Sequence, residues 1–114
     1  MFDLHKAFER KQEYECGRLD AFLFRHRART IRLIAEWVAA ERAEGTGLPL
    51  DPQALAAEVA TATDADLLDR LAALHGADDP AARRRFDRHC ARLRAEAYRQ
   101  LVAEYGDPTP HQLV

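Results

Sequence analysis

The feature that most constrains the fold is the stretch Arg18–Glu44, which contains neither proline nor glycine. Its apolar residues recur three, four and seven positions apart, the spacing that places them on one face of an α-helix. The edges of this apolar stripe are marked by Leu19, Leu23, Ile34 and Trp37 and by Phe24, Ile31, Ala35 and Val38. The stripe covers about half of the circumference, more than the roughly 100° that a surface helix needs to face one core. We therefore predict an amphipathic helix that contacts two partners.

The residues around this stretch give its expected ends. Asp3 is a candidate N-cap for a first helix that begins at Leu4. Gly17 either bends the chain between the two helices or lies inside one continuous helix, at a cost of about 1 kcal/mol. Gly45 suits the left-handed position that ends a helix. Leu48–Leu50 is expected to be extended, because the residue before a proline avoids the helical region.

Two short helices and one long helix are predicted after residue 50. Asp-Pro pairs supply an N-cap and a first helical residue for Pro52–Ala60 and for Pro80–Tyr105. Thr63 is the expected N-cap of the second short helix, which Gly76 ends. The residues expected to form the core from these helices are Leu55, Val59, Leu67, Leu68, Leu71, Leu74, Phe86, Cys90, Leu93, Ala97 and Leu101.

These elements predict an all-α fold, in which two long antiparallel helices are bridged by the pair of short helices. We expect one helical domain over residues 1–106 and an extended or disordered tail over 107–114. A compact domain of this length has a radius of gyration of about 13 Å, whereas each long helix spans about 40 Å. We therefore expect the long helices to pair side by side and to extend beyond the rest of the domain. Two long and two short helices would leave part of the wide apolar stripe uncovered. We therefore expect dimerisation about a twofold axis into a helical bundle.

Composition excludes several classes of function. The formal net charge is −2, which gives no general attraction to nucleic acid or to a membrane. Arginine supplies 15 of the 17 basic residues, a bias typical of GC-rich coding and of a bacterial source. Two cysteines are too few for a disulfide framework, and we recognise no signal peptide or membrane span, so a cytoplasmic location is expected. Serine is absent and no nucleophile–base pair or glycine-rich phosphate loop is evident, so we expect a non-catalytic protein without a cofactor.

Arginine spacing supplies the main candidate for partner binding. Arginines lie three, four and seven residues apart on each long helix, so each set forms one ridge. Two apolar residues, Phe22 and Leu33, flank the first ridge and are expected to be exposed. Such a surface suits a phosphate- or carboxylate-bearing partner or an interface with another protein, although ridges of this kind are more often solvated faces. The partner-binding candidates are Arg18, Phe22, Arg25, Arg29, Arg32, Leu33, Arg85, Arg88, Arg92 and Arg99.

A second candidate site lies between the long helices. Asp20 and Arg27 fall within the apolar stripe, where buried charges must be paired or functional. Asp87 and Arg94 on the last helix are their expected partners, either in ion pairs that fix the register or in a polar pocket with Arg27 as an anion clamp. No metal-ligand spacing is present along the chain. If a metal site exists, the residues to test are His26, His89 and Cys90.

The leading hypothesis is a homodimeric interaction or adaptor protein that uses the arginine ridges on another protein. The first alternative is a regulator that binds a small molecule or a metal between the long helices. The second is an arginine-mediated nucleic-acid binder. We expect nucleic acid not to be a partner, because no aromatic residues interleave with the arginines as a stacking platform requires. We also expect no membrane partner, because the net charge is only −2. The short helical pair could not read DNA either, because acidic residues at the start of its second helix would repel phosphates.

Overall fold

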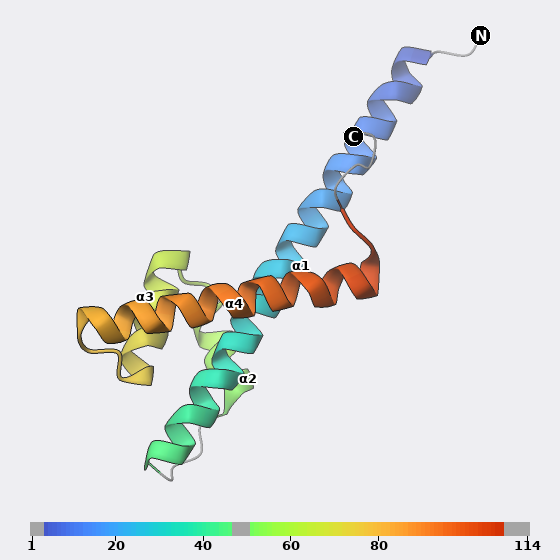
Figure 1. Ribbon diagram of the computed structural model, residues 1–114. Coiled ribbons are helices and arrows are strands. Elements are labelled where there is room, and N and C mark those ends of the chain that lie inside the picture. The colour runs from blue at the N-terminus through green and yellow to red at the C-terminus, as the bar shows by residue number, and fades with distance from the viewer. Residues whose placement is uncertain (1–3, 47–50, 109–114) are drawn as a thin grey trace.

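Every element that the structure describes is an α-helix, which confirms the all-α class (Figure 1). The computed structural model describes the backbone of residues 4–46 and 51–108 and the side chains of residues 17–45, 51–58 and 60–108. The helices are α1 (Leu4–Thr46), α2 (Pro52–Val59), α3 (Asp64–His75) and α4 (Pro80–Tyr105). The expected cap Asp3, the expected extended segment Leu48–Leu50, the side chain of Val59 and residues 109–114 of the expected tail lie outside these ranges.

A single helix of 43 residues, α1, dominates the shape of the molecule. At 1.5 Å per residue it is about 65 Å long, close to the 69 Å extent of the whole chain. It continues through Gly17, which has no other group within 4 Å of its added Cβ position. The expected left-handed conformation of Gly45 is wrong, because α1 continues past it to Thr46 with no positive φ.

The caps of the three later helices follow the sequence. The side chains of Asp51, Thr63 and Asp79 accept hydrogen bonds from backbone N–H groups two or three residues later, at 3.0, 3.3 and 2.8 Å. Gly76 ends α3 with a φ of 84°, a conformation that a residue with a Cβ rarely adopts. These predicted helix starts, and the predicted end at Gly76, are confirmed.

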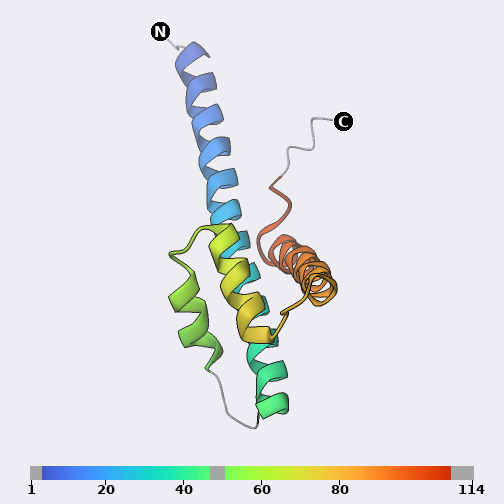
Figure 2. The same ribbon diagram turned by 90° about the vertical axis from the view of Figure 1, so that its left-hand side faces the viewer.

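The other three helices all pack against α1 and form the core with its C-terminal half. α3 and α4 each contact α1 more extensively than they contact each other. α4 crosses α1 obliquely (Figures 1 and 2). Tyr98 contacts Phe22 at one end of the crossing and Phe86 contacts Trp37 at the other. α2 and α3 lie along α1 itself. The buried core cluster consists of Ile31, Ile34, Ala35, Val38, Leu55, Leu67, Leu71, Ala72, Phe86 and Cys90.

The N-terminal arm, which we define as residues 4–17 of α1, extends beyond all the other helices (Figures 1 and 2). The radius of gyration is accordingly 18.6 Å, well above the value of about 13 Å for a compact domain of this length. α1 is therefore long enough to carry a packed half and a projecting half. The expected antiparallel pairing of two long helices bridged by the short helices is not confirmed.

Candidate functional site

The arginine ridge on α1 is largely used to hold α4. Arg29 donates two hydrogen bonds of 2.9 Å to the Glu104 carboxylate and a third to the Gln100 side chain. The hydrogen bond with Arg29 lowers the pKa of Glu104, because it favours the ionised carboxylate. Arg25 lies over the ring of Tyr105 at 4.5 Å. These contacts fasten the C-terminal end of α4 to α1, so they support a structural role for this ridge.

The ridge on α4 differs from the ridge on α1. Its arginines are exposed and lie on the side of the helix away from the core. Arg99 is held by Glu96 at 2.7 Å. Four further arginines continue the ridge toward the start of α4, and we call them the α4 basic face: Arg84, Arg85, Arg88 and Arg92. In the described part of the chain no carboxylate pairs with them.

The two apolar residues expected beside the α1 ridge are not exposed. Phe22 is only 3% exposed, because its ring packs edge-on against Tyr98 of α4 at 5.4 Å. Leu33 is half-buried. The prediction that Phe22 is part of an exposed surface is therefore wrong: oblique packing of α4 covers a side of α1 that the apolar stripe did not include.

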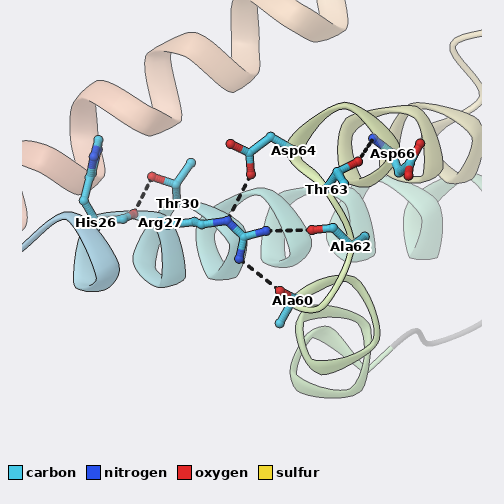
Figure 3. Close-up of polar contacts among 8 residues, drawn as sticks. All are labelled: His26, Arg27, Thr30, Ala60, Ala62, Thr63, Asp64 and Asp66. Atoms are coloured by element: carbon cyan, nitrogen blue, oxygen red, sulfur yellow. Dashed lines mark hydrogen bonds and ion pairs between the residues drawn. The ribbon is translucent and has the colours of Figure 1, made fainter. Parts of the chain in front are cut away.

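Arg27 fixes the turn between α2 and α3 to α1 (Figure 3). Its guanidinium donates to the Asp64 carboxylate at 3.0 Å and to the backbone carbonyls of Ala60 and Ala62 at 3.0 and 2.8 Å. The side chain is still 40% exposed. Arg27 is thus a clamp between three segments rather than a buried charge with a partner on α4.

The expected pairing of Asp20 and Arg27 with Asp87 and Arg94 is wrong. Asp20 is exposed, and Asp87 accepts a hydrogen bond from Arg83 of its own helix at 2.9 Å. Arg94 contributes its backbone carbonyl to a 2.9 Å hydrogen bond with His26, while its guanidinium has no carboxylate partner in the described ranges. The pairing fails because Arg27 is bonded to Asp64 and to the turn between α2 and α3 instead, while Asp87 is bonded to Arg83.

A half-open cavity of about 490 Å³ nevertheless lies between α1, α3 and α4. Three of the four residues expected to form a pocket there line it: Arg27, Asp87 and Arg94. His26 and Cys90 also contribute, whereas Asp20 does not. The structure therefore brings most of these side chains to one place, although not as the ion pairs that we expected.

The three residues that we named for a possible metal site do not converge. His26 and Cys90 line the cavity, whereas His89 stacks on Trp37 at 4.0 Å. No group of three potential ligands is found among the described residues. Burial, with a smaller contribution from Asp87, raises the pKa of the Cys90 thiol to about 12, so it stays protonated and is a poor nucleophile.

An aromatic sandwich near the end of α3 escaped the sequence analysis. The indole of Trp37 stacks between His75 at 4.5 Å and His89 at 4.0 Å, and it donates a hydrogen bond to Glu41. Burial, helped by the charge of Arg92, lowers the pKa of His89, because it disfavours the charged ring. The three rings come from α1, α3 and α4, so their stacking depends on tertiary packing and no local sequence pattern could have predicted it.

Three large apolar side chains stay exposed on α1 next to the N-terminal arm: Leu19 at 41%, Leu23 at 53% and Phe24 at 75%. We call them the free α1 face. They belong to the same apolar stripe whose later members, Ile31 and Ile34, are buried under the other helices. The described part of the chain therefore covers only about half of the stripe.

No helix in the described ranges is both long enough and apolar enough to cross a membrane. Comparisons with known proteins find no matching family model, no matching curated protein and no matching solved structure.

Proposed function

We propose that this protein is a non-catalytic helical interaction protein that acts as a homodimer through α1. The observation that carries the proposal is the free α1 face, Leu19, Leu23 and Phe24, beside an arm that projects from the fold. Contiguous exposed apolar side chains are typical of interaction sites, because their burial is favourable. A buried thiol and paired or solvated charges in the described residues supply no activated nucleophile, which favours binding over catalysis.

The arm supports the same proposal. Most of the stability of a helix in a protein comes from tertiary packing, so a helical segment without such contacts frays. The arm extends past α2, α3 and α4, so these helices give it little support. A second copy that packs along it would supply the missing contacts.

The interface must include both features. A stable interface buries about 800 Å² on each partner, more than three partly exposed side chains can provide. A twofold axis beside the free α1 face would place the same surface of each copy against the other, with each arm along the partner's α1. The arm and the free α1 face then form one continuous surface on one helix.

Mass measurement by light scattering during size-exclusion chromatography tests this proposal. We expect twice the 12.9 kDa chain mass at micromolar concentrations. The double variant Leu19→Glu/Phe24→Glu should be a monomer with an unchanged fold, because both side chains are exposed within one chain. The matched control is Ala40→Glu, exposed near the other end of α1, which should remain a dimer. A wild-type mass of one chain would refute the dimer.

The α4 basic face favours a second surface, for an acidic segment of another protein. Arg84, Arg88 and Arg92 follow one another four residues apart, and like charges at this spacing destabilise a helix by about 0.2–0.5 kcal/mol per pair. A carboxylate-rich partner would relieve that repulsion and could accept paired hydrogen bonds from each guanidinium. Phe86 lies between these arginines in the sequence but is buried in the core, so among the described residues this face offers no aromatic ring for stacking on nucleic-acid bases.

Fluorescence anisotropy with two labelled probes distinguishes these partners. The probes are an oligoglutamate peptide and a single-stranded oligonucleotide with the same number of charges. We expect the peptide to bind in a salt-sensitive way and the variant Arg85→Gln/Arg88→Gln/Arg92→Gln to lose this binding. The control Arg32→Gln removes an exposed arginine of α1 that is paired with Glu36 and should bind as the wild type does. Stronger binding of the oligonucleotide would replace the acidic protein partner with nucleic acid.

A further inference from the structure

The cavity between α1, α3 and α4 has a defined structural origin. α3 and α4 meet where Arg83 pairs with Asp69 at 2.9 Å and His75 contacts Phe86, next to the short loop that joins the helices. From there the two helices diverge over α1, as Figure 2 shows. The result is a wedge with α1 as its floor and a volume of about 490 Å³. Sites for small molecules commonly have volumes of about 300–1,000 Å³.

The inner surface of this wedge is apolar. Ile31 and Ile34 of α1, Leu67 and Leu68 of α3, and Cys90 of α4 line it. Four of these five residues are buried in the core, and Leu68 packs against it. The Cys90 thiol stays neutral because burial raises its pKa to about 12. A ligand inside the wedge would therefore contact hydrocarbon and sulfur rather than charge.

Most polar groups at the rim are already satisfied. Arg27 is occupied by Asp64 and two backbone carbonyls, and Arg83 by Asp69 and Asp87. The Thr30 hydroxyl donates to the backbone carbonyl of His26. These groups form the walls of the site without leaving a strong donor free.

Arg94 is the exception at the rim. Its guanidinium pairs with no carboxylate among the described residues, although the cavity is lined by two carboxylates that are held by other arginines. Two of the three arginines that line the cavity are thus neutralised, and one positive charge remains beside an apolar interior. This charge distribution selects a ligand with one anionic group and an apolar body.

We propose that the wedge binds a small amphiphilic carboxylate, with its carboxylate on Arg94 and its hydrocarbon part over Ile31, Ile34 and Leu67. The lining residues all come from one chain, and one of them, Leu23, also belongs to the free α1 face, so binding is measured at more than one subunit concentration. Binding would make the protein responsive to a free acid of this class while α4 and the other surfaces stay available to partners.

The test uses octanoate as the anionic probe and octan-1-ol as its neutral analogue, measured by calorimetry and by amide NMR shifts. Octanoate should bind saturably and shift the amides of Leu67, Cys90 and Arg94. Arg94→Gln should weaken octanoate binding about tenfold, which corresponds to one lost charge-assisted hydrogen bond, and leave octan-1-ol binding unchanged. Arg92→Gln is the matched control on the outer side of the same helix, and both ligands should bind to it as to the wild type.

Three results would overturn the proposal. The first is the absence of saturable octanoate binding. The second is equal octanoate affinity of the wild type and Arg94→Gln, which would show that Arg94 does not hold the anion. The third is an octanoate affinity that falls as the subunit concentration rises, which would mean that a second copy occupies the wedge. Chain mass is measured separately, so failure of this site and failure of the dimer are distinguishable.

Discussion

The two halves of α1 carry one apolar stripe but meet different surroundings. In the C-terminal half Ile31, Ile34 and Val38 are buried under α2, α3 and α4. In the other half Leu23 and Phe24 face solvent and the arm continues beyond the fold. The comparison teaches that helical periodicity identifies a face that must be covered but does not identify what covers it. Within one chain the answer is three helices for one half, and our proposal is a second chain for the other.

The largest expected effect contrasts a buried phenylalanine with an exposed one. Phe86→Ala should lower the free energy of unfolding by about 3–5 kcal/mol, because it leaves a cavity beneath Trp37. Phe24→Ala should change the stability of the monomer by less than about 0.5 kcal/mol, because the ring is mostly exposed. Urea unfolding at low protein concentration measures both.

The same pair of variants examines the proposed dimer. At high protein concentration Phe24→Ala should become measurably less stable than the wild type, because dimerisation adds to the stability of the wild type. The difference between Phe86→Ala and the wild type should change little with concentration. A large loss of stability in Phe24→Ala at every protein concentration would contradict the exposure of Phe24 on the free α1 face.

The next effect concerns Arg27, which holds the turn between α2 and α3 to α1. Arg27→Met should cost about 1–3 kcal/mol, because the carbonyls of Ala60 and Ala62 lose their donors while the aliphatic stem is kept. The control Arg32→Met removes an exposed ion pair between Arg32 and Glu36, which lie one turn apart on α1. It should lower the free energy of unfolding by about 0.3–0.5 kcal/mol. Urea unfolding of the two variants gives the comparison, and equal costs would show that Arg27 is no clamp.

A smaller effect on the free energy of unfolding depends on pH and comes from His89, which packs against Trp37 in the C-terminal half of α1. Burial and Arg92 lower the pKa of His89 below its ordinary value of 6.5, whereas Glu41 acts in the opposite direction. The folded protein therefore binds the proton less readily than the unfolded chain. This contribution to stability is complete above pH 6.5 and is lost as the pH falls from there through the lowered pKa of His89.

The measurement is an NMR titration of the His89 ring in a His75→Gln background, which leaves one imidazole on Trp37. We expect a midpoint below 6.5 and a urea midpoint that falls over the same pH range. His89→Gln should remove this dependence. A His89 midpoint above 6.5 would contradict the burial of the ring against Trp37.

Local chemistry made much of the fold predictable. The caps at Asp51, Thr63 and Asp79 depend on a side chain and an N–H group two or three residues away, so sequence spacing sufficed. The core faces of α3 and α4 followed from spacing in the same way. Gly17 was ambiguous because an interior glycine costs only about 1 kcal/mol, which helix continuity can offset.

The candidate sites depended on tertiary geometry and were predicted less well. The pairing of Arg27 with Asp64, rather than with Asp87, requires knowing that α3 lies beside that part of α1. The burial of Phe22 requires the oblique crossing by α4. The wedge beside Arg94 arises from the divergence of α3 and α4, and no residue pattern encodes a helix crossing directly.

The smallest effect returns to the projecting half of α1. Gly17 lies within the helix, has an ordinary φ and has open space around its added Cβ position. Gly17→Ala should therefore stabilise the helix locally by about 0.5–1 kcal/mol. Because the arm contributes little to the core, the urea midpoint should stay unchanged while amide hydrogen exchange near residue 17 slows. Because a second copy is proposed to pack along the arm, this protection should also increase with protein concentration in both proteins, and the benefit of alanine should shrink as the dimer forms.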